Sequence, residues 1–305
     1  MTFLPAAQAL VIWRLLDGKP GHESQTLGLV QALTRRCEQL GRSAPRVIDL
    51  PLAGRRLTLL DWLFRRFRPG FLQPRPDLIL GAGHRTHWAL LCARHAFGGR
   101  TVALMTPSLP RSWFDVVVSP RHDEVAGGNV IETVGVLNPM QPGIKRPGYT
   151  LVLVGGISKH FHWRNDDILS QIEAIMARHP QVCLTDSRRT PPELRAALAE
   201  RWPVVYQPWD ACPPGWLANE LATADNAWVS EDSVSMIYEA LTAGCETGLI
   251  SLDAANEGRL ARGIHQLEAE GRVRRLNTPW RSAGDRPPLQ EAARVAACLL
   301  PETDA

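Results

Sequence analysis

The sequence has little net charge, no long apolar run and no closely spaced cysteine pair. Its 34 basic and 31 acidic residues leave a formal charge of +3, too little to indicate a surface that wraps nucleic acid. The longest run without a charge, residues 1–13, is shorter than the roughly 20 apolar residues that span a bilayer. It has no basic segment before it and leads through Arg14 into a glycine loop, so it predicts a first strand rather than a signal peptide.

The cysteines are dispersed along the chain and form no CxxC motif. This spacing is typical of free, buried thiols in a reducing compartment, and we expect a cytoplasmic protein. The six are Cys37, Cys92, Cys183, Cys212, Cys245 and Cys298. Hydrophobic residues make up 45% and charged residues 21%, a balance that excludes general disorder. At roughly 150 residues per domain, 305 residues suggest two domains.

Lysine is scarce, and its positions direct attention to two loops. Of the 34 basic residues only Lys19, Lys145 and Lys159 are lysines. Two of the three lie in glycine-containing loops, at residues 17–22 and 155–160. Chance placement is an alternative that the sequence leaves open.

Short apolar segments alternate with amphipathic ones, which predicts parallel sheets covered by helices. In the first half, Gly, Pro or Asp bounds strand candidates at residues 10–16, 46–50, 78–80, 101–105, 116–118 and 130–136. The stretch 23–40 has apolar residues at three- and four-residue steps, as in a helix.

A proline- and glycine-rich passage at 138–148 predicts a linker, after which the pattern restarts. Strand candidates follow at 150–154, 182–185, 204–206, 227–229 and 248–252, and 289–300 is an amphipathic helix. We expect an α/β fold of two Rossmann-like domains, residues 1–140 and 149–285, facing a cleft. In such sheets ligands bind beyond the carboxyl ends of strands, so the loops after strands are the candidate sites.

The loop at 17–25 follows the first strand and opens a helix. Gly18 and Gly21 permit a tight turn, the amides at the helix start attract an anion, and Lys19 adds a cation. His22 adds an imidazole, a side chain that can act as an acid or a base. A GxxxxGK[ST] phosphate loop is absent, which argues against a nucleotide-hydrolysing site. A plain turn with a surface histidine is the alternative.

The loop at 81–86 follows the third strand and has Arg85 and Thr86 at a helix start, which suits an anionic or polar ligand. His84 and His87 have an HxxH spacing, but no carboxylate or cysteine stands beside them. We therefore predict no metal site.

The second half repeats this arrangement of loops after strands. The first of its strands runs into Gly155 and Gly156, and the next leads to Arg188 and Arg189, which form either a solvated turn or a phosphate clamp. In 224–240 a strand leads into a helix that starts near Ser233 or Ser235, where hydroxyls and free amides suit a diphosphate. Glu239 lies one turn past Ser235, placed to accept ribose hydroxyls, or it is a solvated residue behind an N-cap.

Three strings resemble the elongated-mitochondria fission-factor family. They are Asp-Gly-Lys-Pro-Gly-His-x-x-Gln at 17–25, Ser-Arg-Arg-Thr-Pro at 187–191 and Glu-Asp-Ser-Val-Ser-Met at 231–236. The resemblance covers nearly the whole chain in order. Plant members of that family are implicated in mitochondrial fission, and many bacterial members are loosely labelled sugar-nucleotide epimerases.

That family is in turn similar to the GT-B glycosyltransferases, and the resemblance implies roles for particular residues. Residues 286–305 would form a helix that crosses back to the N-terminal domain. The residues that would approach the donor diphosphate are Gly156, Ser158, Ser233, Ser235 and Met236. Arg188 or Arg189 would neutralise its charge, and Glu239 would bind the ribose. His22 would be the base or the group that faces the acceptor, with Lys19 beside it. The glycine loop resembles that of the peptidoglycan N-acetylglucosaminyltransferase, except for Lys19-Pro20.

The expected function is glycosyl transfer from a nucleoside-diphosphate sugar, preferably UDP-linked, to an unidentified acceptor. It would need no metal or other cofactor, because helix N-termini and arginines would stabilise the leaving diphosphate. An epimerase on the same fold is one alternative, with Asp17, His22 and Glu23 supplying part of its acid–base chemistry. A non-catalytic binding or scaffold protein is another.

Residues 55–71 interleave five arginines with Leu, Trp and Phe. On a helix, Leu60, Leu63, Phe64 and Phe67 would share one face, which favours a buried core helix. The flanking arginines also suit an interfacial helix on anionic lipid, a peripheral contact at the inner face of the membrane.

Overall fold

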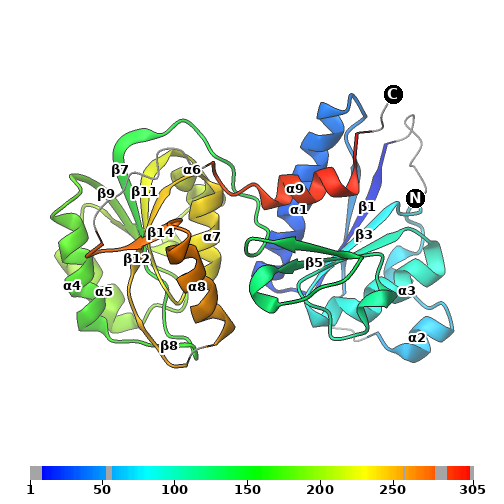
Figure 1. Cartoon of the computed structure of the whole chain (residues 1–305), viewed down its shortest axis with the longest axis horizontal. Coiled ribbons are helices and arrows are strands. Elements are labelled where there is room, and N and C mark those ends of the chain that lie inside the picture. The colour runs from blue at the N-terminus through cyan, green and yellow to red at the C-terminus, as the bar shows by residue number, and fades with distance from the viewer. Residues whose placement is uncertain (1–8, 53–56, 257, 279–286, 303–305) are drawn as a thin grey trace. The chain divides into compact units, whose positions relative to one another are not determined.

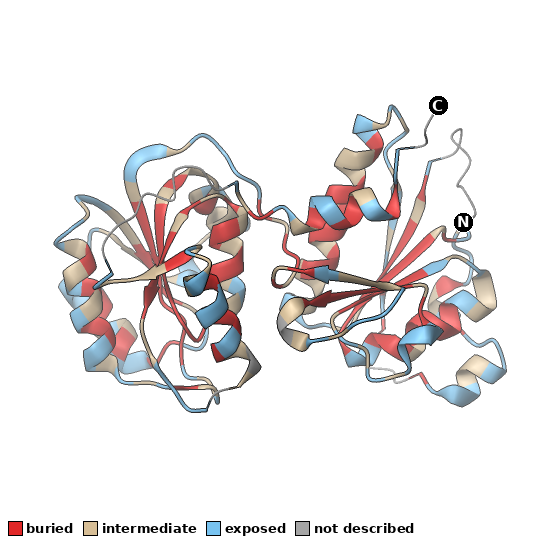
Figure 2. Ribbon diagram, in the orientation of Figure 1, coloured by how far each residue is buried: buried red, intermediate tan, exposed pale blue. Residues whose placement is uncertain are grey.

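The chain forms two α/β units, one built from residues 1–139 with 290–305 and the other from 140–289. We examined a computed structural model that describes residues 9–52, 57–256, 258–278 and 287–302 (Figure 1). In both units the strands are largely buried and the helices turn one face to the sheet (Figure 2). The predicted α/β fold with two Rossmann-like domains is confirmed.

The first unit has a six-stranded parallel sheet in the order β2-β1-β3-β4-β5-β6. The strands are β1 (Val11–Leu16), β2 (Arg46–Pro51), β3 (Leu78–Ala82), β4 (Arg100–Leu104), β5 (Val116–Pro120) and β6 (Val130–Thr133). Its helices are α1 (Pro20–Gln39), α2 (Leu59–Leu63), α3 (His87–Phe97) and α9 (Glu291–Leu299).

Both faces of this sheet are covered. On one face, α1 and α9 pack over Ile12, Leu80 and Val102, which are all buried. On the other, α3 packs over Trp13 and Ile79. The last helix thus returns to the first unit, where it lies beside α1 (Figure 1).

The second unit repeats the plan with the order β10-β9-β7-β11-β12-β14. Its strands are β7 (Arg146–Leu153), β9 (Gln181–Thr185), β10 (Tyr206–Gln207), β11 (Ala224–Ser230), β12 (Glu246–Ile250) and β14 (Val273–Arg275), and a short antiparallel pair joins β8 (Phe161–His162) to β13 (Asp253–Ala254). Its helices are α4 (Asn165–Met176), α5 (Pro192–Arg201), α6 (Trp216–Thr223), α7 (Val234–Thr242) and α8 (Arg259–Ala269). One sheet face packs against α4 and α5.

Strand β7 begins inside the segment predicted to be a linker. Pro147 and Gly148 lie within it, although proline cannot donate to a ladder. The pairing with β11 shifts register there, Gly148 adopts φ +76°, and its amide donates to Asp225. Between the pairs Arg146–Ala224 and Thr150–Asn226, β7 has three residues where β11 has one, so residues of β7 stay unpaired there and Pro147 is accommodated in a central strand.

The prediction of a buried core helix at 55–71 is wrong. Arg55 and Arg56 lie outside the described residues, and the helix covers only Leu59–Leu63. Leu60, Leu63 and Phe64 are each more than half exposed, while Phe67 packs in the core beside Trp13. The helix ends because Arg65 takes the left-handed conformation, with φ +51°, which redirects the chain.

The expectation of buried thiols holds for half of the cysteines. Cys37, Cys92 and Cys245 are buried. Cys183 and Cys212 are half-buried, and Cys298 lies on the exposed face of α9.

Candidate functional site

Each sheet reverses its strand order at one point, and the predicted site residues gather beside these points. In the first unit the order turns between β1 and β3, and in the second between β7 and β11. In open parallel sheets ligands bind beside such a point, at the carboxyl ends of the strands. The loops after β1, β3, β7 and β11 carry the candidate residues.

In the first unit, Asp17 and His22 form a hydrogen-bonded pair. The Nδ1 atom of His22 lies 2.9 Å from a carboxylate oxygen of Asp17, whose side chain is 1% exposed. The histidine side chain is itself 18% exposed. A carboxylate on Nδ1 fixes the ring orientation and leaves Nε2 as the nitrogen able to accept a proton. This is the geometry of a general base with an orienting acid.

Gly83, at the end of β3, makes room for this imidazole. A Cβ at Gly83 would lie 2.1 Å from Cε1 of His22, and the backbone there has φ +78°. Both the ring position and the backbone conformation therefore require glycine. The spacing of Gly81 and Gly83 marked the loop, but only the structure shows which side chain the second glycine admits.

The amides of the first loop are partly occupied by the protein's own carboxylates. Asp17 accepts from the amide of Lys19, and Glu23 accepts from that of Gly18. Pro20 opens α1 and has no N–H to offer. This loop is therefore better suited to proton transfer than to phosphate binding. Lys19 precedes the helix and is exposed.

His87 is a further residue of this region whose role the sequence did not indicate. It is 1% exposed, and burial lowers its pKa to about 4, with smaller contributions from His84 and His22. The amide of Ser108 donates to Nδ1, so Nε2 carries the proton. Among the described residues that Nε2–H has no acceptor. A buried donor without a partner is a candidate for contact with a ligand oxygen.

In the second unit, the carboxylate of Asp232 organises the loops after β7, β9 and β11. Its side chain is fully buried. It accepts from the amide of Gly156 at 2.9 Å, from Nη2 of Arg189 at 2.8 Å and from the hydroxyl of Ser230 at 2.7 Å. Asp232 lies within the string at 231–236, but local spacing could not show that it joins the loops after β7 and β9 to its own.

The glycines after β7 are explained by close packing with these loops. A Cβ on Gly155 would lie 2.3 Å from Asp232, and one on Gly156 would lie 2.0 Å from the backbone of Arg189. Since the Gly156 amide already donates to Asp232, Gly156 supports the loop arrangement directly. Ser158, farther along, is half-buried and accepts from the amide of His160.

The two adjacent arginines have different surroundings. Besides Asp232, Arg189 donates to the hydroxyl of Ser233 at 2.8 Å and to the carbonyl of Gly156 at 3.2 Å. It therefore serves first as a brace between loops, although 44% of its side chain remains exposed. Arg188 is exposed and has no ion pair within the described part of the chain.

Helix α7 starts at the switch point of the second unit. Ser233 occupies its cap position, and its hydroxyl donates to Asp232 rather than capping the helix. Val234, Ser235 and Met236 form the first turn, whose N–H groups have no acceptor within the helix. These donors, the positive end of the helix dipole and the exposed guanidinium of Arg188 favour an anion at this edge.

Glu239 lies on the same helix, four residues after Ser235. Burial raises the pKa of its carboxyl group to about 7. No hydrogen bond to its side chain is made by the residues that the structure describes, so desolvation acts on it uncompensated. A partly buried carboxyl without a protein partner is available to accept hydroxyls from a ligand.

Other polar groups at this edge have structural roles. Glu231 accepts from the amide of Leu252 at 2.7 Å and pairs with Arg275 at 2.8 Å. Lys145, the lysine outside the glycine loops, is structural as well but lies at the opposite edge of the sheet, directly before β7, where it donates to the carbonyls of Leu221 and Ala243 at the ends of α6 and α7. Within the described residues no group of three or more His, Cys, Asp or Glu side chains is placed to hold a metal ion.

Comparison with known proteins identifies one family and a shared fold. A family model described as mitochondrial fission ELM1 matches residues 20–302. The comparison with curated proteins finds no match.

Several solved structures are similar across most of the chain. A protein assigned as a UDP-N-acetylglucosamine 2-epimerase from Listeria monocytogenes is 10% identical, with 85% of this chain and 82% of that one covered and a TM-score of 0.51. The UDP complex of MnaA from S. aureus is 12% identical, with 87% and 89% covered and a TM-score of 0.48. MurG from Acinetobacter baumannii is 13% identical, with 95% and 90% covered and a TM-score of 0.46. At these identities the likeness concerns the fold alone, two α/β units each built on a parallel sheet.

Proposed function

The chain belongs to the mitochondrial fission ELM1 family, and from its GT-B-like fold and the geometry of its two switch points we propose that it is a metal-independent glycosyltransferase that uses a nucleoside-diphosphate sugar. The observation that carries this proposal is the set of N–H and guanidinium donors at the carboxyl edge of the second sheet. There the first turn of α7 and the pair Arg188–Arg189 lie beside the β7–β11 switch point.

The diphosphate of the donor binds at the start of α7. The amides of Val234, Ser235 and Met236, with the hydroxyl of Ser235, donate to its oxygens. Arg188 supplies a guanidinium with no ion pair in the described chain, and Arg189 adds the exposed part of its charge. Gly156, Ser158 and Ser233 shape this edge through the loop contacts described above. Such donors stabilise a departing diphosphate without a metal ion.

The ribose binds to Glu239, whose carboxylate accepts its two hydroxyls. This assignment is supported by the absence of another partner for Glu239 among the described residues and by its place one helical turn beyond Ser235. UDP is the preferred nucleotide.

In the transfer step, a hydroxyl oxygen of the acceptor forms a bond to the anomeric carbon of the sugar. The bond between that carbon and the phosphate oxygen breaks, and the diphosphate leaves with the electron pair. The acceptor proton passes to Nε2 of His22, which Asp17 holds through Nδ1. Lys19, exposed at the start of α1, contributes positive charge beside the acceptor.

Calorimetric titration of the protein with UDP, GDP, ADP and CMP tests the donor site. We expect one nucleoside diphosphate to bind, and Arg188→Ala to weaken that binding about tenfold or more through loss of a charge-assisted hydrogen bond. Arg201→Ala is the matched control, since Arg201 is an exposed arginine at the far end of α5. Equal nucleotide affinity of the two variants would refute the proposed role of Arg188, and a protein that binds no nucleotide would refute the donor site.

The two alternatives predict different products. An epimerase interconverts two nucleotide sugars with no acceptor, and the acid–base groups Asp17, His22 and Glu23 cluster after β1. A scaffold protein binds nucleotide without turnover. The protein is incubated with the tightest-binding nucleotide sugar, with and without cell-derived acceptors, and the products are analysed by mass spectrometry. An altered sugar on the nucleotide indicates an epimerase, free nucleotide indicates a transferase, and an unchanged donor indicates a scaffold protein.

A peripheral membrane contact through residues 57–72 is a second part of this proposal. Leu60, Leu63, Phe64, Phe71 and Leu72 are each more than half exposed, and Leu72 is 95% exposed. Arg65, Arg66 and Arg68 are exposed among them. Apolar side chains flanked by arginines suit the interface of an anionic bilayer. No helix in the described chain is both long and apolar enough to cross a membrane.

Co-sedimentation with vesicles tests this contact. We expect binding to phosphatidylglycerol vesicles that weakens with added salt and with Leu72→Asp, and little binding to neutral vesicles. Equal sedimentation with both vesicle types, or with neither, would contradict the proposal.

A further inference from the structure

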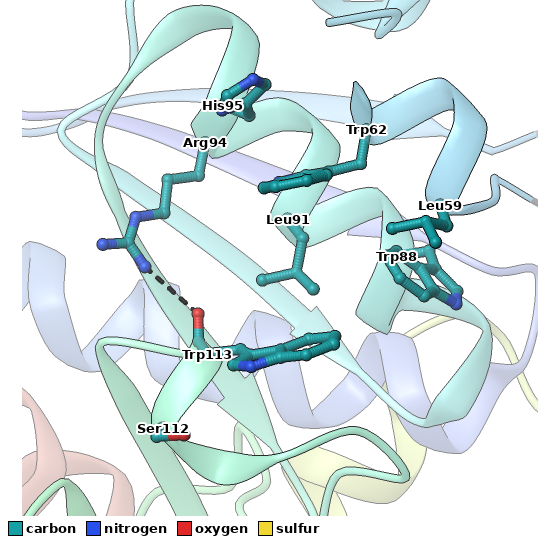
Figure 3. Close-up of a pocket in the computed structure, with 8 residues that line it drawn as sticks. All are labelled: Leu59, Trp62, Trp88, Leu91, Arg94, His95, Ser112 and Trp113. Atoms are coloured by element: carbon teal, nitrogen blue, oxygen red, sulfur yellow. Dashed lines mark hydrogen bonds between the residues drawn. The ribbon is translucent and has the colours of Figure 1, made fainter. Parts of the chain in front are cut away.

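A pocket of about 630 Å³ lies on the outer side of α3 in the first unit, and none of its lining residues belongs to the candidate site (Figure 3). Its size falls within the roughly 300–1,000 Å³ typical of small-molecule sites. It lies between α2, α3 and the turn before β5. The lining residues are Leu59, Trp62, Trp88, Leu91, Arg94, His95, Ser112 and Trp113.

The surface of the pocket is mainly aromatic and aliphatic. In Figure 3, the side chain of Leu91 lies between the rings of Trp62 and Trp113, with Trp88 and Leu59 to one side. The ring centroids of Trp88 and Trp113 are 6.1 Å apart. Leu59 is 55% exposed and Trp113 is 44% exposed, so a ligand that covered them would remove large apolar areas from water.

The two basic side chains of the lining, Arg94 and His95, are already used within the protein. Arg94 donates to the carbonyl of Trp113 at 3.1 Å and pairs with Asp115 at 3.2 Å. The Nε2 atom of His95 accepts from Arg65 at 3.2 Å, and its ring lies 4.8 Å from that of Trp62. A sugar or nucleotide needs several convergent polar partners, whereas a hydrocarbon needs none. The pocket therefore favours a hydrocarbon.

The charge next to the pocket is positive. Arg65 lies against His95 at its edge, and Arg66 and Arg68 follow on the same exposed segment. The described residues 57–72 hold these three arginines and one carboxylate, Asp61, which accepts from the amide and hydroxyl of Thr58. A ligand whose apolar part fills the pocket would thus gain from an anionic group at its end.

We propose that this pocket binds the hydrocarbon chain of a single anionic amphiphile, with the head group beside Arg65. The inference extends the membrane contact proposed above, since the pocket adjoins the exposed segment 57–72 and shares Leu59 and Trp62 with α2. It concerns one bound molecule rather than a bilayer, and it uses no residue of the nucleotide site.

Titration of the protein with decyl phosphate, kept below its aggregation concentration, tests the proposal. Tryptophan fluorescence and calorimetry measure the binding. Decanol provides the same chain without charge, and inorganic phosphate provides the charge without a chain. We expect saturable binding of decyl phosphate, weaker binding of decanol and none of inorganic phosphate. Binding of inorganic phosphate alone, or no binding of decyl phosphate, would overturn the proposal.

Two variants locate the binding. Leu59→Asp places a carboxylate in the lining at the first position of α2, where an acid suits the helix dipole and the side chain is half exposed. It should weaken the binding of decyl phosphate about tenfold or more, which is the effect of losing contact with roughly two methylene groups. Trp113→Ala should do the same. Val204→Asp, an equally drastic change at a 94% exposed site of the second unit, should not.

The outcomes separate this inference from the membrane contact and from nucleotide binding. Unchanged affinity in both pocket variants would overturn the pocket even if the protein sediments with anionic vesicles. Arg65→Gln should reduce the affinity for decyl phosphate toward that for decanol, and an unchanged preference for the charged ligand would refute the head-group assignment. Nucleotide titrations of Leu59→Asp should match those of the unaltered protein.

Discussion

Replacement of Glu239 by glutamine should change how stability depends on pH. Burial raises the pKa of this carboxyl group from 4.5 to about 7 in the folded protein. Between these values the folded state keeps a proton that the unfolded chain has released, so the associated stability is fully present below pH 4.5 and is lost as the pH rises through 7. At roughly 1.4 kcal/mol per pKa unit, the loss between pH 4 and pH 8 reaches about 3 kcal/mol.

Glutamine has nearly the shape of a protonated glutamate and does not ionise. Glu239→Gln should therefore match the unaltered protein near pH 4 and exceed it at pH 8 by up to about 3 kcal/mol. Scanning calorimetry at several pH values gives this difference, with Glu200→Gln on the exposed face of α5 as the control. A difference that is the same at pH 5 and pH 8 would refute the argument that burial governs this carboxyl group.

The same residue links stability to nucleotide binding. If ribose hydroxyls donate to the Glu239 carboxylate, binding favours its ionised form, so complex formation near pH 7 should release a proton. Calorimetry in buffers of different ionisation enthalpy measures this release. Its persistence in Glu239→Gln would place the ribose elsewhere.

Three further predictions follow from the site geometry. Gly83→Ala should displace the imidazole of His22, because a Cβ at this position would overlap the ring, and should therefore lower turnover. NMR would show the displacement as shifted signals of the His22 ring, and unchanged signals would contradict the close approach. Asp232→Asn should lower the free energy of unfolding by about 1.5–3 kcal/mol, because the buried partner of Arg189 loses its charge; unchanged thermal unfolding would refute this. His87→Gln should reduce the loss of stability in acid. Because the pKa of His87 is lowered to about 4, this residue stays neutral in the folded protein, while in the unfolded chain it gains a proton as the pH falls below 6.5. This difference lowers the free energy of unfolding by up to about 3 kcal/mol. Urea denaturation between pH 4 and pH 7 measures this slope, and equal slopes for the two proteins would count against it.

The periodicity and the turn residues were enough to place most strands and the long helices. The segments predicted at 10–16, 46–50 and 116–118 correspond to β1, β2 and β5 within one or two residues. Such strands are apolar runs bounded by glycine, proline or aspartate, a signal carried by adjacent residues. Strand β7 begins earlier than predicted. Pro147 indicates the end of a strand in the sequence, but an irregularity in the pairing at Gly148, whose amide donates to Asp225, accommodates it.

The prediction of a buried helix at 55–71 was wrong for a different reason. Its apolar spacing fits a buried face, but the chain turns at Arg65, so Phe67 enters the core while Leu60 and Leu63 stay outside. Whether an amphipathic face is covered depends on which other segment packs on it, and no local pattern contains that information.

For the candidate site, the sequence by itself determined that polar and glycine-rich loops follow the strands and that His22, the paired arginines and Glu239 lie in or beside them. Only the tertiary structure decided their neighbours. Asp17 and His22 are five residues apart, but Asp232 and Gly156 are 76 apart. Parallel strands bring such distant loops to one edge of a sheet, where a hydrogen bond or a missing Cβ couples them. Spacing along the chain therefore predicts which loops carry polar groups, and strand order decides which of those groups meet.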